Sequence, residues 1–276
     1  MLFRSMRDIC LSPTLSTSFG FFERPNGYIV VHDLFPIFSQ SKISSYSDLI
    51  YPSPWYWQGK VAYNKTRDFA WADKHDQLYW RGSTTGGFSR DGGWKHQHRQ
   101  RFVNKINNEA QAKIAANKGD ASKPDWRISE VPSAEYQKKL IDVRFSHVDQ
   151  CDPADCEAQI KFFGVKDMVD MQDAWGYKFL LDIDGNAFSG RFYAFLRSQS
   201  QVFKQALFQE WHMEWLKPWL HYVPMSMRGD DWLEVVRYYS SSGEKAEGMA
   251  KASADWANKV LRKVDMEVWF FRLLLE

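Results

Sequence analysis

The stretch YKFLLDIDGNAFSGRFYAFL, residues 177–196, joins two apolar segments through a turn of small residues. Its first eight residues form a short apolar run, which is typical of a buried strand. The turn runs from Asn186 to Gly190, and Arg191 then begins an amphipathic segment that we expect to be helical within residues 187–198. A buried strand that leads through a turn into a helix is the repeating unit of an α/β fold.

The stretch LYWRGSTTGGFSRDGGW, residues 78–94, repeats this layout earlier in the chain. A strand-like run over residues 78–82 leads into a turn rich in glycine and hydroxyl groups, and we expect a helix to begin near Gly93 or Trp94. Apolar or aromatic residues then recur every four positions and predict one face of a helix, formed by Trp94, His98, Phe102, Ile106, Ala110 and Ile114.

The rest of the chain also alternates between short apolar runs and helical patterns. We expect further strands at residues 28–38 (broken at Pro36), 140–147, 200–204 and 220–225, and helices at residues 205–216 and 245–262. This alternation predicts an α/β fold with a mainly parallel sheet covered on both faces. Ligands of such sheets bind where the carboxyl ends of strands meet the N-termini of helices, so the two quoted turns are the first candidates for a site.

Charge and composition exclude several classes of function. The 36 Lys and Arg residues are balanced by 34 Asp and Glu residues, and the net charge of +2 gives no reason to expect nucleic acid as a partner. No run of about 18 apolar residues is present, so we predict neither a transmembrane segment nor a signal peptide within the chain. Aromatic residues make up 16% of the chain, which suits core packing, interfaces and the apolar faces of sugars alike.

The glycine-rich turn at residues 82–87 can bring its backbone close to an anion. Its hydroxyl side chains at positions 83–85 could donate hydrogen bonds, and the guanidinium of Arg81 or Arg90 could hold phosphate oxygens. The spacing matches neither the lysine-containing P-loop nor the dinucleotide-binding GxGxxG pattern. The residues alone therefore leave open an anion-binding loop or a plain turn with surface arginines.

Three other groups of polar residues are candidate sites. We interpret the basic cluster after the turn as a solvent-exposed helix face, formed by Lys95, His96, His98, Arg99 and Arg101. Asp182 and Asp184 could cap a turn, contact a ligand or hold a metal, and capping is favoured because no third oxygen ligand follows. The third group consists of His212, Glu214 and His221, which could supply metal ligands or acid–base chemistry. A Trp-rich helix that ends at Pro218 explains the same pattern structurally, and this interpretation is favoured.

Four residues separate the cysteines Cys151 and Cys156 in QCDPADCEAQ. This spacing allows a small closed loop, so a disulfide is favoured in an oxidising compartment, with two free thiols as the alternative. A metal site is disfavoured because no Cys or His cluster completes it.

Four motifs, in order along the chain, resemble glycosyltransferase family 90, which groups capsule-associated fungal xylosyltransferases with animal protein O-glucosyltransferases. They are FPIFSQSKISSYSDLIYPSPWYW (35–57), LYWRGSTTGGFSRDGGW (78–94), YKFLLDIDGNAFSGRFYAFL (177–196) and FKQALFQEWHMEWLKPWLHYVPMS (203–226). The second and third look closest to the fungal branch. The resemblance implies a GT-B fold, with two Rossmann-like halves facing a cleft. It also implies an inverting transfer of xylose or glucose from a UDP-sugar to a hydroxyl of a glycan or glycoprotein, without an obligatory metal or other cofactor.

The same resemblance assigns roles to individual residues. Ser83 and Arg90 match donor-binding positions of the glycine-rich motif, and the second donor-binding turn is matched by Asn186, Ala187, Phe188, Ser189, Gly190 and Arg191. The segment that lines the acceptor and sugar side of the cleft is matched by Tyr51, Trp55 and Trp57. Arg90 and Arg191 are the expected holders of the departing diphosphate, because positive groups must stabilise it when no metal does.

An inverting transferase also needs a carboxylate to take the proton of the acceptor hydroxyl. Family members carry this aspartate in an Asn-x-x-Asp-type segment before the stretch that matches residues 35–57. Asp8 and Asp33 lack those surroundings, so no catalytic residue is assigned. The alternative function is therefore a catalytically inactive UDP-sugar-binding protein that lacks the general base.

The resemblance divides the chain into three parts. Residues 1–70 are expected to be the remnant of a truncated acceptor-side lobe, residues 71–262 a largely complete Rossmann-like donor lobe, and residues 263–276 a helix that packs back toward the first lobe. Family members reside in the Golgi or endoplasmic reticulum lumen, usually behind a membrane anchor, and the resemblance implies the same location for the full-length form.

Overall fold

The computed structural model describes residues 8–26, 30–108, 110–120 and 122–276. Its centre is a five-stranded sheet in which every neighbouring pair of strands is parallel. In spatial order the strands are β6 (Ile141–His147), β3 (His75–Ser83), β7 (Tyr177–Ile183), β8 (Gln201–Gln205) and β9 (Val223–Pro224). The predicted parallel sheet is confirmed, and its arrangement is consistent with a Rossmann-like lobe.

The order of the strands reverses between β3 and β7. From β3 the chain places β6 on one side, then returns to place β7 on the other side, and β8 and β9 follow outward from β7. The two quoted turns leave the carboxyl ends of these two neighbouring strands. Such a reversal opens a crevice beyond the strand ends, which is where ligands of α/β sheets bind.

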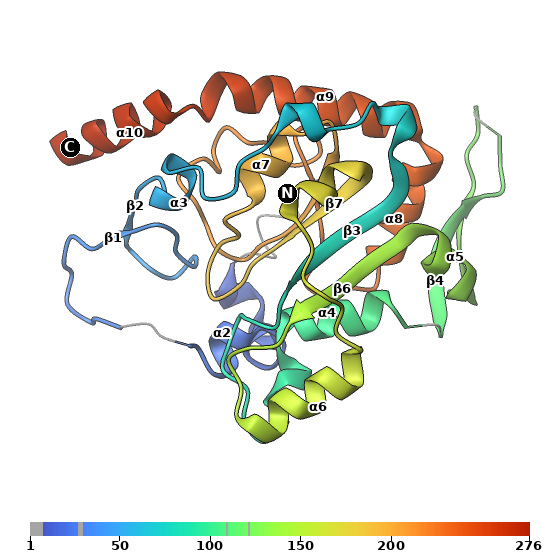
Figure 1. Ribbon diagram of the computed structural model, residues 1–276, viewed down its shortest axis with the longest axis horizontal. Helices are drawn as coiled ribbons and strands as arrows, with labels where there is room; N and C mark the ends of the chain where they lie inside the picture. Colours follow the sequence, from blue (N-terminus) through green and yellow to red (C-terminus); the bar gives the residue numbers. More distant parts are fainter. Residues whose placement is uncertain (1–7, 27–29, 109, 121) are drawn as a thin grey trace.

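Helices cover both faces of the sheet, as predicted, and Figure 1 shows the sheet between them. Alternate residues of a strand point to opposite faces, so Trp80 of β3 lies in one apolar core and Tyr79 in the other. The core around Trp80 is closed by α4 (His98–Ile106), α5 (Ala134–Leu140) and α8 (Trp232–Ser241). The core around Tyr79 is closed by α7 (Phe192–Arg197) and the C-terminal part of α9 (Gly243–Val260).

The helix predicted from Trp94 to Ile114 is shorter than expected. A 3-10 turn, η5 (Gly93–His96), leads into α4, which ends at Ile106, and Ile114 lies in a hairpin of β4 (Gln111–Asn117) and β5 (Trp126–Pro132). Asn107 Nδ2 donates to the carbonyl of Val103 (2.7 Å) and satisfies one of the last helical carbonyls. A spacing of four residues also keeps side chains on one face of a strand, so the period alone could not separate the two structures.

The helix predicted at residues 205–216 is wrong. The backbone N–H groups of Leu207 and Phe208 donate to Asp184 Oδ2, at 2.6 and 3.0 Å, and Gln209 forms a bridge with Lys42. Tertiary partners therefore occupy the backbone groups that a helix would pair internally. The helix predicted at residues 187–198 forms over a narrower range, as α7, and the helix predicted at residues 245–262 forms as α9, which begins and ends two residues earlier.

The strand predicted at residues 28–38 is also wrong over residues 30–37. Residues 30–37 belong to no strand and are exposed, and residues 28 and 29 lie outside the described residues. Only β1 (Phe38–Ser39) pairs, with β2 (Leu49–Ile50). The other short elements are η1 (Ile9–Leu11), η2 (Pro13–Thr17), α2 (Gly20–Glu23), α3 (Pro54–Trp57), η3 (Lys65–Arg67), η4 (Trp71–Asp73) and η6 (Met171–Gly176).

The C-terminal helix α10 (Lys263–Leu275) follows α9 across the top of the molecule in Figure 1, with α3 below it. Trp57 Nε1 donates to Glu267 Oε1 (2.8 Å), and the rings of Tyr51 and Phe270 are 5.5 Å apart. The first and last segments of the chain are therefore in contact, while the three-part division stays a prediction. No helix in the described residues is both long and apolar enough to cross a membrane.

Cys151 and Cys156 form a disulfide, so the favoured pairing is confirmed. Their loop leads into α6 (Pro153–Phe163), and Cys151 pairs with Ser89 of the glycine-rich segment in an isolated bridge. Cys10 is free and exposed.

Candidate functional site

A cavity of about 660 Å³ lies beyond the carboxyl ends of β3 and β7. Both quoted turns line it, together with parts of the N-terminal segment and of the loop before β7. The lining residues are Gln40, Trp55, Tyr79, Trp80, Arg81, Gly82, Ser83, Thr85, Arg99, Ser146, Met168, Val169, Met171, Gly185, Asn186, Ala187, Phe188, Ser189, Gly190, Arg191 and Phe195. The cavity therefore occupies the position that the strand order favours for a ligand.

The two turns touch one another at the back of this cavity. The backbone N–H of Gly86 donates to Asn186 Oδ1 (3.1 Å). Gly86 has a φ of +131°, and a Cβ built on it would lie 2.5 Å from the imidazole of His98. Only glycine fits this approach without strain.

Arg99 of α4 joins the turns more extensively. Its Nε donates to the carbonyl of Asp184 (2.8 Å), and its Nη1 donates to the carbonyl of Ser83 (3.0 Å) and to Thr85 Oγ1 (2.8 Å). Its Nη2 donates to the carbonyl of Ile183 (3.1 Å). One guanidinium thus holds the carboxyl ends of both β3 and β7 together.

The prediction of a solvent-exposed basic face is therefore wrong for His98 and Arg99. Both side chains are buried, whereas Lys95 and His96 are exposed and Arg101 is half-buried. His98 stacks on Phe19 with ring centroids 3.8 Å apart, and burial lowers its pKa to about 3, so the imidazole is neutral. The four-residue period could have indicated this burial, because it places His98 on the apolar face of the helix and Arg99 next to that face.

Arg99 and Arg191 form the positive wall of the cavity. Each guanidinium lies over the Trp80 ring, 5.5 Å from its centroid. Burial lowers the pKa of both groups, and the charge of Arg191 lowers that of Arg99 further. Within the described residues, their side chains bond to carbonyl and hydroxyl oxygens and not to a carboxylate.

The two other arginines near the turns are neutralised. Arg81 Nη2 pairs with Asp142 Oδ1 (2.7 Å), and Arg90 Nε pairs with Asp152 Oδ2 (2.6 Å). The buried Nε1–H of Trp80 has no acceptor within the described residues. The cavity therefore offers two guanidiniums that no carboxylate contacts, beside a buried indole N–H without an acceptor, an arrangement that favours an anionic, hydrogen-bonding ligand.

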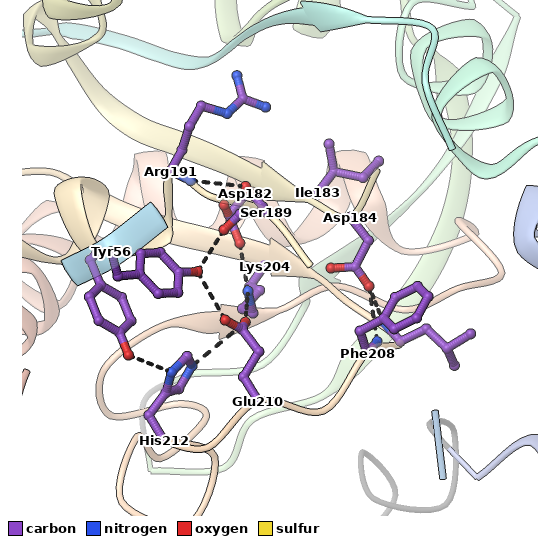
Figure 2. Close-up of polar contacts among 12 residues, drawn as sticks. Tyr56, Asp182, Ile183, Asp184, Ser189, Arg191, Lys204, Phe208, Glu210 and His212 are labelled. Atoms are coloured by element: carbon purple, nitrogen blue, oxygen red, sulfur yellow. Dashed lines mark hydrogen bonds and ion pairs between the residues drawn. The ribbon is translucent and has the colours of Figure 1, made fainter. Parts of the chain in front are cut away.

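Figure 2 shows a buried polar network behind the second turn. Tyr56 Oη lies 2.7 Å from the carbonyl oxygen of Ser189 and 2.9 Å from Glu210 Oε2. Lys204 Nζ pairs with Asp182 Oδ2 (2.6 Å) and lies 3.6 Å from Glu210 Oε1. Burial, reinforced by Asp182 and Asp184 and opposed by Lys204 and Tyr56, raises the pKa of Glu210 to about 7.

The acidic and histidine candidates have structural partners. Asp184 caps the turn that contains Leu207 and Phe208, as favoured, while Asp182 pairs with Lys204. His212 Nδ1 lies 2.9 Å from the hydroxyl of Tyr193, and His221 Nδ1 accepts from the backbone N–H of Lys217 (2.9 Å). Glu214 is exposed. No cluster of three acidic, His or Cys side chains suited to a metal occurs in the described ranges.

Comparison with known proteins decides the family. The model of Glycosyl transferase family 90 matches residues 28–276. The chain belongs to this family. It is 28% identical over 116 residues to protein O-glucosyltransferase 3 of Rattus norvegicus, which covers 41% of this chain and 23% of that protein. It is 24% identical over 250 residues to the O-glucosyltransferase rumi homolog of Anopheles gambiae, covering 87% of this chain and 54% of that protein.

Protein O-glucosyltransferase 1 of Rattus norvegicus is also similar, at 25% identity over 244 residues, covering 87% of this chain and 56% of that protein. The chain thus spans about half the length, or less, of these curated relatives.

The structure gathers most of the residues expected from the family 90 resemblance. Ser83 and the six residues from Asn186 to Arg191 line the cavity. Trp55 joins them, with its indole against Gly190, where a Cβ would be 3.3 Å from the ring. Tyr51 and Trp57 instead contact α10, and the exposed Arg90 lies outside the lining.

The family 90 cavity contains no acidic side chain from the described residues. Asp8 caps its own 3-10 turn through the backbone N–H of Cys10, and Asp33 is exposed. Neither lies in the lining, so the general base stays unassigned.

Proposed function

We propose that the cavity binds a nucleoside diphosphate sugar, UDP-glucose or UDP-xylose, and that the protein transfers its sugar to a hydroxyl. The observation that carries this proposal is the pair Arg99, which is buried, and Arg191, which is half-buried: both line one cavity, and neither guanidinium bonds to a carboxylate among the described residues. A diphosphate supplies the missing negative charge, and the planar guanidinium matches phosphate oxygens. Family membership supports the transfer reaction.

The two turns, the end of β3 and the N-terminal segment suit the remaining parts of such a donor. The side chains of Ser83 and Asn186 and the Trp80 indole offer polar contacts, and the indole of Trp55 offers an apolar face to a sugar. The names of the relatives support glucose as the sugar and a protein as the acceptor. The resemblance of the motifs at residues 78–94 and 177–196 to the fungal branch instead supports xylose as the sugar and a glycan as the acceptor.

Transfer with inversion requires the acceptor hydroxyl to lose its proton as it attacks the anomeric carbon, while the sugar–phosphate bond breaks and the diphosphate leaves. Arg191 and Arg99 are placed to stabilise the charge of the leaving diphosphate. The alternative function is a silent donor-binding protein, and the absence of a carboxylate among the described lining residues favours it. The Cys151–Cys156 disulfide supports a lumenal, oxidising location.

Calorimetric titration tests the proposal. UDP should bind saturably, and UMP should bind about tenfold more weakly because charge-assisted contacts to the second phosphate are lost. Absence of saturable UDP binding would remove the donor site. If UDP binds, hydrolysis or transfer of the sugar from UDP-glucose or UDP-xylose identifies an enzyme, and its absence identifies the silent binder.

A further inference from the structure

The hydroxyl of Tyr56 faces two oxygens but carries one proton. The carbonyl of Ser189 (2.7 Å) can only accept a hydrogen bond, and an ionised Glu210 (2.9 Å) can also only accept. Both contacts are satisfied together only when the Glu210 carboxyl is protonated and donates to Tyr56 Oη. In that state the Tyr56 O–H is left to donate to Ser189.

We propose that Glu210 is a positioning residue for the donor-binding turn. As a neutral acid it donates to Tyr56, which then holds the Ser189 carbonyl. When Glu210 ionises, the Tyr56 proton turns to the carboxylate and the turn loses this bond. The inference rests on the proposed donor site, because Ser189 belongs to the turn that carries Arg191.

The groups around Glu210 bring the pKa of its carboxyl into the neutral range. Lys204 of β8 faces Oε1 but is engaged with Asp182 of β7, and His212 Nε2 lies 3.7 Å from the same oxygen. Burial dominates, and together with the nearby Asp182 and Asp184 it raises the pKa of Glu210 to about 7. On the other side, the pKa values of Tyr56 and of Tyr193 in α7 are raised well above 10, chiefly by burial, so both phenols stay protonated.

Tyr56 is well placed to affect the ligand cavity without touching a ligand. It lies in α3, stacks on Tyr193 with ring centroids 3.7 Å apart, and follows Trp55 directly. Trp55 covers Gly190, the residue after Ser189. The bond from Tyr56 to Ser189 therefore ties the segment that carries Trp55 to the second turn.

The test is the pH dependence of donor affinity. UDP-glucose and UDP-xylose are the probes, because their diphosphate does not change charge between about pH 6 and 8.5, unlike that of UDP. For the wild-type protein we expect the Kd to rise about threefold to tenfold over this range, the effect of one hydrogen bond. Glu210→Gln should keep the low-pH affinity throughout, because the amide N–H donates permanently to Tyr56.

Two variants and one ligand-free measurement complete the design. Tyr56→Phe should bind weakly at every pH, because the bond to Ser189 is lost. Glu210→Ala removes the competing acceptor, so its affinity should not depend on pH. Hydrogen exchange of the peptide containing residues 186–191, corrected for its intrinsic pH dependence, should quicken with pH in the wild type and not in Glu210→Gln. A pH-independent wild type, or a Glu210→Gln variant that keeps the wild-type dependence, would overturn the inference. If neither probe binds at any pH, the donor site fails, and hydrogen exchange still decides the role of Glu210.

Discussion

The arginines of this chain differ in what neutralises them. Arg81 and Arg90 have carboxylate partners. Within the described residues, Arg99 and Arg191 instead bond to neutral oxygens and lie over aromatic rings, Trp80 for both and Phe195 for Arg191 as well. Burying a charge without a partner is costly, so such a pair persists where an anion completes it. The positive charge of the site thus comes from Arg99 and Arg191, and the sequence motifs had indicated only Arg191 as a ligand-binding residue.

The first prediction concerns these arginines. Arg191→Ala should weaken UDP binding by about 1–3 kcal/mol, because a charge-assisted contact is lost. Arg90→Ala is the matched control and should leave the affinity unchanged, since Arg90 is exposed and paired with Asp152. Titration of both variants checks this. An effect at Arg90 equal to that at Arg191 would mean that the site lies elsewhere.

A second prediction concerns His98. Its pKa is lowered to about 3 by burial, so the folded protein holds it neutral while the unfolded chain protonates it near pH 6.5. Stability from this group is present above pH 6.5 and is lost as the pH falls toward 3. His98→Gln should therefore lose less stability between pH 6.5 and 4 than the wild type, by on the order of 2 kcal/mol. Denaturant unfolding measures the difference, and His96→Gln, at an exposed position, should follow the wild type.

At the scale of elements, the two strand–turn–helix units could be predicted because each is encoded locally. A short apolar run, a cluster of glycine and hydroxyl residues and an amphipathic segment each follow from their own residues. The wrong predictions, a helix at residues 205–216 and a strand at residues 28–38, share one cause: the hydrogen-bond partners of a backbone segment are set by other elements of the fold. Asp184 accepts hydrogen bonds from the amides of Leu207 and Phe208, and residues 30–37 form no strand, although the carbonyl of Ile37 accepts from Leu49 of β2.

A third prediction compares two glycines. Gly86→Ala should destabilise the fold by about 1–3 kcal/mol, because its φ is +131° and the new Cβ would meet His98 at 2.5 Å. Gly248→Ala, inside α9 with nothing within 4 Å of the new Cβ, should stabilise it by about 0.5–1 kcal/mol. Thermal and denaturant unfolding report both signs. Tolerance of Gly86→Ala would show that the two turns are not packed as described.

At the scale of the whole molecule, α10 connects the end of the chain to its beginning. Trp269 packs between Trp211 and Trp215, with ring centroids 5.7 and 5.1 Å away, and its Nε1 donates to the carbonyl of Ile50 (3.4 Å). Trp55, which lines the cavity, lies in the segment that this helix contacts. The shape of the cavity therefore depends on contacts between residues about 200 positions apart.

The fourth prediction tests this connection. Trp269→Ala should lower the free energy of unfolding by about 2 kcal/mol, since a half-buried ring is lost. Phe271→Ala, on the exposed side of the same helix at 65% exposure, should change it by less than about 0.5 kcal/mol. Equal losses for both variants would contradict the packing of α10 described above.

The sequence by itself determined the parallel α/β sheet, the two turns, the disulfide spacing and, through four motifs, the family. These features depend on local period and on residues that are neighbours in the chain. The tertiary structure decided that Arg99 is a buried bridge, that Arg90 is a surface ion pair, and that Tyr56 links Ser189 to Glu210. Burial and charge pairing depend on what other elements bring alongside a residue, and no pattern in a single segment contains that information.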